Sequence, residues 1–202
     1  MMKKLLIGLM AMLALPMAMA ADFKEGTHYD VIKQTATAKP EVIEFFSYYC
    51  PHCFKFEPVA ESIKKSLPEG VAFKKNHVSF IGGSMGEEMV RAFAAAEMLE
   101  VEPAISHAIF DSIHNKRQNF TSRDDLRSIF VANGVDGKKF DSAASSFVVN
   151  GMVSQMEKNT INYKIRGVPA LVVNGKYQVN TGSVKSIEEL NELVSYLANL
   201  KG

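Results

Sequence analysis

The chain has 202 residues, and its 23 lysines and arginines nearly balance its 22 aspartates and glutamates, which leaves a formal net charge of +1. A chain so close to neutral has no electrostatic basis for binding nucleic acid or another polyanion. Its length suffices for one domain with its own hydrophobic core, or for one such domain carrying an insertion.

The first twenty residues have the pattern of a secretory signal peptide. Lys3 and Lys4 precede an apolar stretch at residues 5–15, and small side chains at Ala18 and Ala20 suit cleavage after Ala20. The apolar stretch is too short to cross a bilayer, and no later segment has the pattern of a transmembrane helix. We therefore expect an exported protein that is not embedded in the membrane and that functions in an oxidising compartment.

Three strands are predicted in the first part of the chain, with one helix between the second strand and the third. Apolar runs predict the strands at residues 28–32, 42–46 and 71–77. The helix has apolar side chains at helical spacing, at Phe56, Val59, Ala60, Ile63 and Leu67. The two cysteines of the chain lie at the junction between the second strand and this helix.

The middle of the chain is helical in pattern, and strand character returns near the end. From Gly82 to about Tyr163 the apolar positions follow a helical period throughout. Two short strands at residues 170–173 and 177–179 flank an Asn-Gly pair, which is typical of a β-hairpin. A last helix begins after Ser186, a favourable N-cap residue. This order predicts an α/β domain interrupted by a helical insertion.

Cys50 and Cys53 are the only cysteines, and Pro51 and His52 separate them. A Cys-x-x-Cys pair indicates either a redox dithiol or half of a metal site. Pro51 suits the first turn of a helix, so Cys50 lies at the helix N-terminus, where free N–H groups and the helix dipole favour a thiolate. A protonated His52 adds a further positive charge. Cys53, one turn further on, should be more buried and act as the resolving thiol.

The remaining residues argue against other roles for the two cysteines. A zinc site needs two more ligands near the tetrad, and because there is no second cysteine pair we expect neither a metal nor a cofactor. A c-type haem needs a histidine after the second cysteine, where this chain has Phe54. A structural disulfide closing so short a loop would constrain the unfolded chain only weakly. The other histidines are scattered and are predicted to be structural or exposed: His28, His77, His107 and His114.

Several segments resemble the DsbA family of periplasmic disulfide oxidases, within the thioredoxin superfamily. They are residues 44–57 (EFFSYYCPHCFKFE), 75–78 (KNHV), 147–149 (FVV), 166–170 (RGVPA) and 173–177 (VNGKY). The similarity runs from the signal peptide to near the C-terminus. It implies a thioredoxin fold with an inserted α-helical domain. The expected division is 1–20 for the signal peptide, 21–81 and 151–202 for the two parts of the thioredoxin-like domain, and 82–150 for the insertion, with a connecting helix opening the last part.

The same resemblance implies an activity and its partners. The Cys50–Cys53 disulfide would pass to reduced exported polypeptides through a mixed disulfide on Cys50. A membrane quinone reductase of the DsbB type would then reoxidise the dithiol. The peptide bond between Val168 and Pro169 would be cis and lie beside the dithiol, with the Val168 backbone pairing to a bound peptide.

Glu44 lies within an apolar strand, and two interpretations of it are open. In the first, Glu44 stands at an edge or end position with its carboxylate in water. In the second, which the resemblance favours, it is a buried acid near Cys53 that gives or takes a proton. Glu57 and Lys75 are weaker candidates for the same charge network.

Two alternatives to a disulfide-forming oxidase remain at this point. One is a periplasmic reductase or isomerase that uses the same dithiol. The other is a non-catalytic chaperone that binds peptides on an apolar surface beside Pro169. Isomerases of the known dimeric kind carry an additional dimerisation domain, which this sequence does not show, so we expect a monomer. The signal peptide and the resemblance together predict that it is located in the periplasm.

Overall fold

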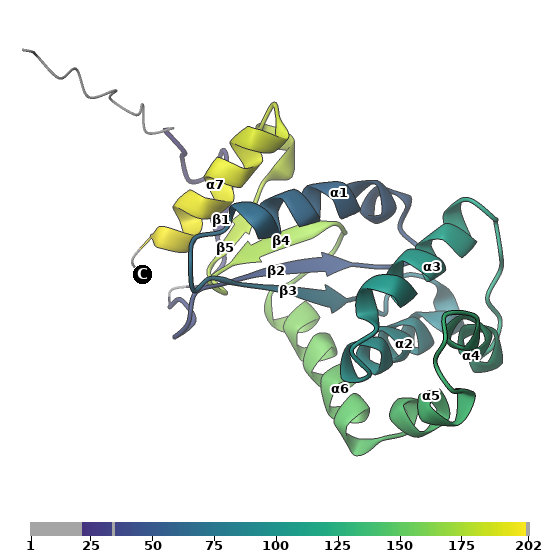
Figure 1. The fold of residues 1–202 in the computed structure, drawn as a ribbon. Helices are drawn as coiled ribbons and strands as arrows, with labels where there is room; N and C mark the ends of the chain where they lie inside the picture. The colour runs from purple at the N-terminus through teal and green to yellow at the C-terminus, as the bar shows by residue number, and fades with distance from the viewer. Residues whose placement is uncertain (1–21, 34, 201–202) are drawn as a thin grey trace, which may run out of the picture.

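The computed structural model describes residues 22–33 and 35–200, so the predicted signal peptide lies outside the described residues. Five strands form one sheet: β1 (Tyr29–Val31), β2 (Glu41–Phe46), β3 (Ala72–His77), β4 (Ala170–Val173) and β5 (Tyr177–Val179). The helices, shown in Figure 1, are α1 (Pro51–Ser66), α2 (Gly86–Met98), α3 (Glu102–His114), α4 (Arg123–Ala132), α5 (Gly137–Ala144), α6 (Phe147–Asn162) and α7 (Ile187–Asn199). Short 3-10 turns occupy Gly83–Met85 and Thr181–Ser183.

The sheet has the order β1-β5-β4-β2-β3, with β2 and β3 parallel and the other neighbours antiparallel. β2 lies between two neighbours and is covered on both faces, so all of its residues from Val42 to Phe46 are buried. Successive side chains of a strand point to opposite faces. Val42 accordingly packs with the core under α1 and α7, whereas Ile43 packs with the core on the other face.

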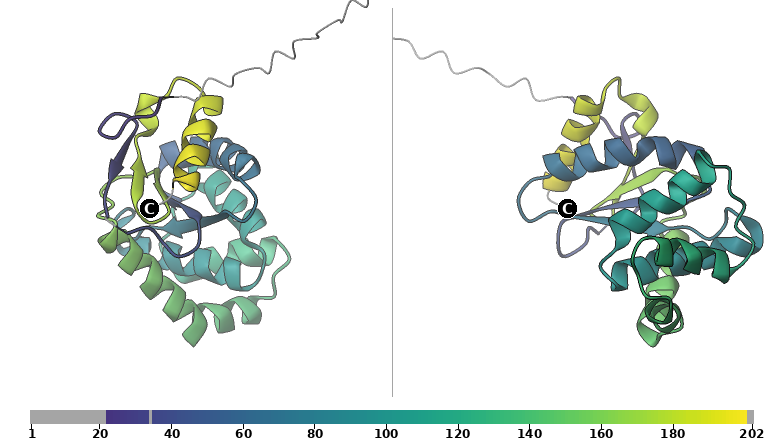
Figure 2. Two further views of the ribbon diagram at one scale, coloured as in Figure 1. Left: turned by 90° about the vertical axis from the view of Figure 1, so that its left-hand side faces the viewer. Right: turned by 45° about the vertical axis from the view of Figure 1, so that its right-hand side comes forward.

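Helices cover both faces of this sheet. α1 and α7 pack side by side on one face, and α6 packs against β3 on the other, as Figures 1 and 2 show. The chain between β3 and β4 forms the helical block, in which α2 contacts α3, α5 and α6. This arrangement confirms the predicted α/β domain with a helical insertion. None of the helices among the described residues is both long and apolar enough to cross a membrane.

The core of the helical block is continuous with the segment that carries the cysteines. One cluster of buried side chains contains Phe46, Cys50 and Cys53 from the sheet side, together with Phe93 and Phe110 from α2 and α3. The insertion therefore forms part of the surroundings of the dithiol. We propose the domain division at 81/82 and 150/151 given above, and the second of these boundaries falls within α6, which connects the block to the sheet.

The loop after β3 is held close to the active-site segment by a glycine. Gly82 has a φ of 100°, and a Cβ atom built on it would overlap the ring of Tyr49. Gly83 also has a positive φ, of 57°, but a Cβ there would meet nothing within 4 Å. Both glycines therefore have a left-handed backbone that favours glycine, but only at Gly82 would a side chain also collide with Tyr49.

Gly82→Ala is expected to lower the free energy of unfolding by roughly 2–4 kcal/mol, because the left-handed backbone and the overlap with Tyr49 both cost energy. Gly83→Ala is the matched control, with an expected loss of about 1 kcal/mol from the backbone alone. Urea unfolding followed by circular dichroism measures both values. Equal losses would show that the Tyr49 ring moves aside at no cost.

Candidate active site

Cys50 lies where the turn after β2 meets the first residue of α1. The Cys50 N–H donates to the Ser47 carbonyl at 3.0 Å, which closes the turn, and Pro51 opens the helix. The backbone N–H of Cys53 donates to the Sγ of Cys50 at 3.2 Å, so Cys50 caps α1 with its sulfur. The predicted positions of Cys50 and Pro51 at the helix N-terminus are confirmed.

The two thiols, which are free in this structure, differ in accessibility in the predicted sense. Cys50 is 6% exposed and Cys53 is fully buried. Cys50 is therefore the more accessible of the two thiols. His52 is exposed, and within the described residues it forms no side-chain hydrogen bond, so its effect on the thiolate remains a prediction.

The Val168 segment meets the dithiol from a distant part of the chain. The Sγ of Cys50 lies 3.4 Å from the Val168 carbonyl, to which its S–H donates, and the peptide bond between Val168 and Pro169 is cis. Both residues are partly exposed. The cis bond and its place beside the dithiol, which the family resemblance implied, are confirmed.

Burial dominates the chemistry of Cys53. Removal from solvent raises the pKa of its thiol, and the neighbouring Cys50 and Glu44 raise it further, while a backbone hydrogen bond with Ser47 acts in the opposite direction. The Cys53 thiolate is therefore costly in this site, and any reaction that releases it will favour uptake of a proton.

Glu44 is a buried acid within β2. It is fully buried, and in the described part of the chain neither carboxylate oxygen has a hydrogen-bond partner. Burial raises its pKa from 4.5 to about 8, although the charge of Lys75 acts in the lowering direction. The predicted burial of Glu44 is thus confirmed and the edge position is wrong, because β2 lies inside the sheet. The exchange of a proton between Glu44 and Cys53 stays a prediction.

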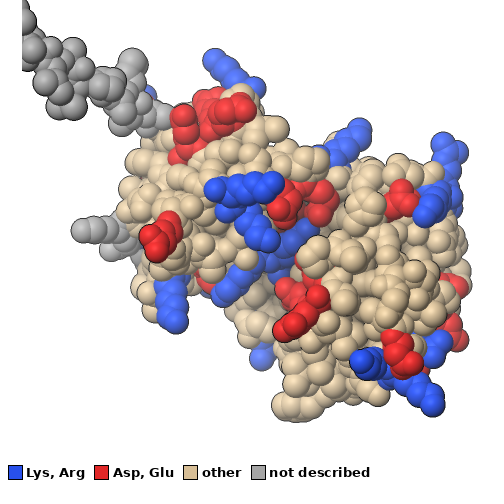
Figure 3. All heavy atoms as spheres, viewed as in Figure 1, with Lys and Arg blue, Asp and Glu red and all other residues tan. Residues whose placement is uncertain are grey.

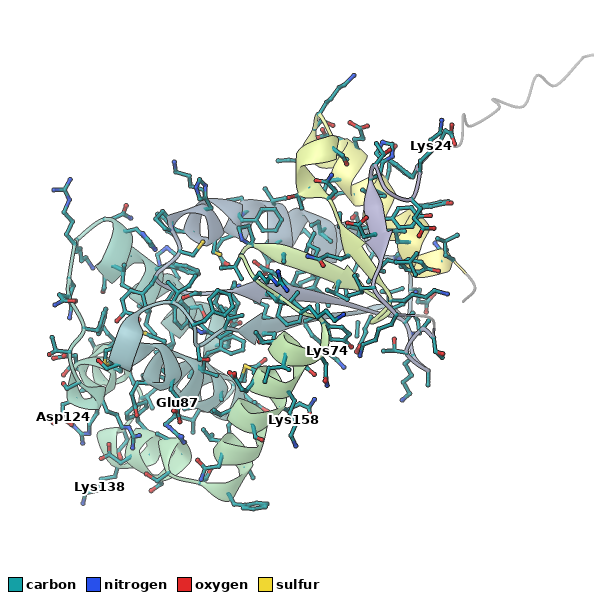
Figure 4. The ribbon with its side chains drawn as sticks, turned by 180° about the vertical axis from the view of Figure 1, so that it is seen from behind. Lys24, Lys74, Glu87, Asp124, Lys138 and Lys158 are labelled. Carbon is teal, nitrogen blue, oxygen red and sulfur yellow. The ribbon has the colours of Figure 1, made fainter. Side chains whose placement is uncertain are left out.

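Lys75 connects Glu44 to the surface. The β2–β3 register places Lys75 opposite Glu44, with its Nζ 3.8 Å from Oε2 of Glu44 and 2.7 Å from Oε1 of Glu57. The adjacent Lys74, labelled in Figure 4, pairs instead with Glu41 at 2.6 Å. Glu57 and Lys75 therefore form one charge network with Glu44, as the sequence suggested.

Comparison with known proteins decides the family. Residues 41–194 match the family described as the DSBA-like thioredoxin domain. The chain is 37% identical to the thiol:disulfide interchange protein DsbA of Escherichia coli K12, with 99% of this chain and 100% of that protein covered. The chain belongs to the DsbA family. It is a thiol:disulfide oxidoreductase with a thioredoxin fold and an inserted helical domain, so the resemblance seen in the sequence is confirmed.

Solved structures of DsbA-family proteins have the same architecture. The disulfide oxidoreductase DsbA from Proteus mirabilis is 38% identical, with a TM-score of 0.79 over 88% of this chain and 96% of that one. DsbA from Klebsiella pneumoniae is 28% identical, with a TM-score of 0.83 over 90% of this chain and 100% of that one.

In this DsbA-family chain a cleft of about 470 Å³ lies between α1, β3 and the helical block. Glu57 and Lys75 line it, so the buried Glu44 lies directly behind its wall. Figure 3 shows acidic and basic side chains together across the middle of this face. Glu97, which also lines the cleft, has its pKa raised to about 7 by burial and by the nearby Glu102. In the described residues no group of three His, Cys, Asp or Glu side chains is arranged to hold a metal ion.

Sequence reasoning missed the side chains that hold the turn before Cys50. Tyr48 is fully buried, its N–H donates to Nε2 of His77 at 3.0 Å, and its carbonyl lies 2.7 Å from Nε2 of His114. Burial lowers the pKa of His77 to about 3, so this imidazole is neutral and can accept. His77 ends the strand that runs parallel to β2, and this position could have indicated that it lies near the turn before Cys50. Nothing in the sequence indicates that His114 lies there.

Glu44→Gln is expected to raise the free energy of unfolding of the reduced protein by about 4 kcal/mol near pH 7.5 and by less than about 0.5 kcal/mol at pH 4.5. The folded pKa of about 8 exceeds the ordinary 4.5, so the wild type has its full stability below pH 4.5 and loses stability as the pH rises towards 8. The glutamine does not titrate, and the variant should lack this decline.

Urea unfolding at the two pH values tests this expectation. Glu61→Gln is the matched control, because Glu61 lies on α1 with a 60% exposed side chain. A wild type whose stability does not fall between pH 4.5 and 8 would contradict the assignment of a protonated Glu44.

Proposed function

We propose that this protein is a disulfide-forming oxidase of the periplasm, exported by a signal peptide cleaved after Ala20. It donates the Cys50–Cys53 disulfide to reduced exported polypeptides. The observation that carries the proposal is the 3.2 Å hydrogen bond from the Cys53 backbone to the Sγ of Cys50 at the start of α1. A donor and a helix N-terminus aimed at this sulfur stabilise its thiolate, and so favour the reduced protein and the transfer of the disulfide outward.

The transfer takes place in two displacements. A substrate thiolate attacks Sγ of Cys50, the bond between Cys50 and Cys53 breaks, and Cys53 leaves with the electron pair. A second substrate thiolate then attacks the substrate sulfur of the mixed disulfide and releases Cys50 as a thiolate. Two substrate thiols become a disulfide, and the enzyme disulfide becomes a dithiol.

Glu44 is the proton donor to the departing Cys53 in this proposal. With a pKa of about 8, Glu44 is mostly protonated at neutral pH, and it lies close enough to Cys53 for its ionised form to raise the pKa of that thiol. The raised pKa of Cys53 makes its thiolate a strong base in this site. Transfer of the proton leaves the new carboxylate beside Lys75, which favours the ionised form. Reoxidation returns the proton along the same path.

A substrate peptide binds along the Val168–Pro169 segment. The partly exposed Val168 lies beside the sulfur of Cys50, so a peptide pairing with the Val168 backbone brings its cysteine to the reactive atom. A Proteus mirabilis DsbA variant, 38% identical with a TM-score of 0.79, has been solved with the non-covalently bound peptide PWATCDS. That precedent supports a peptide site here.

A membrane quinone reductase of the DsbB type reoxidises the dithiol after each transfer. This part of the proposal rests on family membership, since the reaction leaves a reduced protein that needs an electron acceptor. The protein acts as a monomer.

The reduction potential of the Cys50–Cys53 couple is expected to lie well above the value of about −270 mV typical of thioredoxin. Equilibration with glutathione mixtures, followed by alkylation of free thiols and mass measurement, gives the value. Tryptophan fluorescence is no alternative because the chain contains none. A potential near that of thioredoxin would exclude the oxidase and make the protein a reductase.

Cys50→Ser is expected to abolish oxidation of a reduced test protein. Cys53→Ser, first converted to its mixed disulfide with glutathione on Cys50, is expected to accumulate a mixed disulfide with the test protein, with glutathione leaving as the thiol. The more accessible sulfur, that of Cys50, forms the intermediate in this mechanism, and the fully buried Cys53 resolves it. Non-reducing electrophoresis distinguishes the two. If Cys50→Ser kept full activity in preventing aggregation, the function would not depend on the thiol of Cys50, and the protein would instead be a peptide-binding chaperone.

A further inference from the structure

The turn that presents Cys50 is held from both sides of the Tyr48 backbone. On one side His77, at the end of β3, accepts the Tyr48 N–H. On the other side Nε2 of His114, the last residue of α3, lies 2.7 Å from the Tyr48 carbonyl. A carbonyl oxygen only accepts, so His114 carries a proton on Nε2 and donates it. The helical block thus bonds to the main chain two residues before the reactive cysteine.

The same imidazole touches the chain on the far side of the dithiol. The ring of His114 stacks on that of Phe54, with centroids 5.0 Å apart and planes 11° from parallel. Phe54 directly follows Cys53, and its own N–H donates to the Cys50 carbonyl at 3.1 Å. One half-buried side chain therefore contacts both flanks of the Cys50–Cys53 segment.

A second contact from α3 reinforces this attachment. The hydroxyl of Tyr48 lies 2.7 Å from Oγ of Ser106, and Ser106 donates onward to Glu102 at 2.7 Å. Ser106 precedes His114 by eight residues, a little more than two helical turns. α3 therefore holds Tyr48 by its side chain and by its carbonyl, which fixes the turn against the helix.

We propose that His114 is a positioning residue for the dithiol, which sets the redox equilibrium of Cys50 and Cys53 through the Tyr48 carbonyl. The proposal rests on the proposed function, in which these cysteines are the redox couple. The bond from the Cys53 N–H to Sγ of Cys50 is strongest when that sulfur is a thiolate, in the reduced protein. Its geometry depends on where the turn places Cys50. Loosening the turn therefore destabilises the reduced form more than the disulfide.

The test compares equilibrium constants with glutathione for His114→Phe, His114→Gln and His114→Ala. His114→Phe keeps the stacking on Phe54 and removes the donor, whereas His114→Gln keeps a donor. We expect the phenylalanine and alanine variants to shift the equilibrium towards the disulfide by roughly three- to tenfold, the size of one hydrogen bond. The glutamine variant should stay within about twofold of wild type, since its donor replaces the lost one.

His107→Phe is the matched control, because His107 is an exposed histidine on the same helix. A wild-type constant in His114→Phe would overturn the proposal, and so would an equally large shift in His114→Gln. The phenylalanine and glutamine variants still decide the matter if the alanine variant fails to fold. The wild-type constant itself tests the proposed function, whereas the ratio of variant to wild type tests His114, so the two can fail separately.

Discussion

The hydrogen bond from the Cys53 backbone to the sulfur of Cys50 requires that α1 begin at Pro51. One residue earlier or later, the free N–H groups of the first turn would point away from that sulfur. Pro51 favours this start because it lacks an N–H and has a helical φ. The bond between the Cys50 N–H and the Ser47 carbonyl then fixes the turn before it. The reactivity of the dithiol thus depends on the position of one helix start.

Two opposing effects act on the pKa of Glu44: burial raises it and the charge of Lys75 lowers it. Lys75 lies 3.8 Å from the carboxylate and favours its ionised form, yet the pKa is raised to about 8. Lys75 is nearer to Glu57, at 2.7 Å, so its charge is shared between two acids. The loss of hydration on burial outweighs the remaining attraction. An acid that stays protonated at neutral pH inside an apolar strand lowers stability, which suggests that chemistry rather than folding maintains it.

The sequence allowed the strands, the helix start at Pro51 and the burial difference between the cysteines to be predicted, because each depends on residues close together in the chain. The meeting of Cys50 with Val168, 118 residues apart, was expected only from the family resemblance. The contact of His114 with Tyr48, 66 residues apart, was not expected at all. Periodicity shows that a helix is amphipathic, but it does not show which partner each side chain meets.

The helical insertion helps to bury Cys53, and this burial is the reason for the proposed role of Glu44 as a proton donor. The core of the insertion contains Cys53, and this burial raises the pKa of its thiol. A buried thiolate leaving group would slow the release of a disulfide unless a proton reached it at the same time. Solvent cannot supply that proton directly, because Cys53 is fully buried. In the mechanism proposed above, Glu44, with a pKa of about 8 and a link through Lys75 to a cleft open to solvent, gives this proton and recovers it. On that proposal, the insertion and the buried acid are two parts of one arrangement.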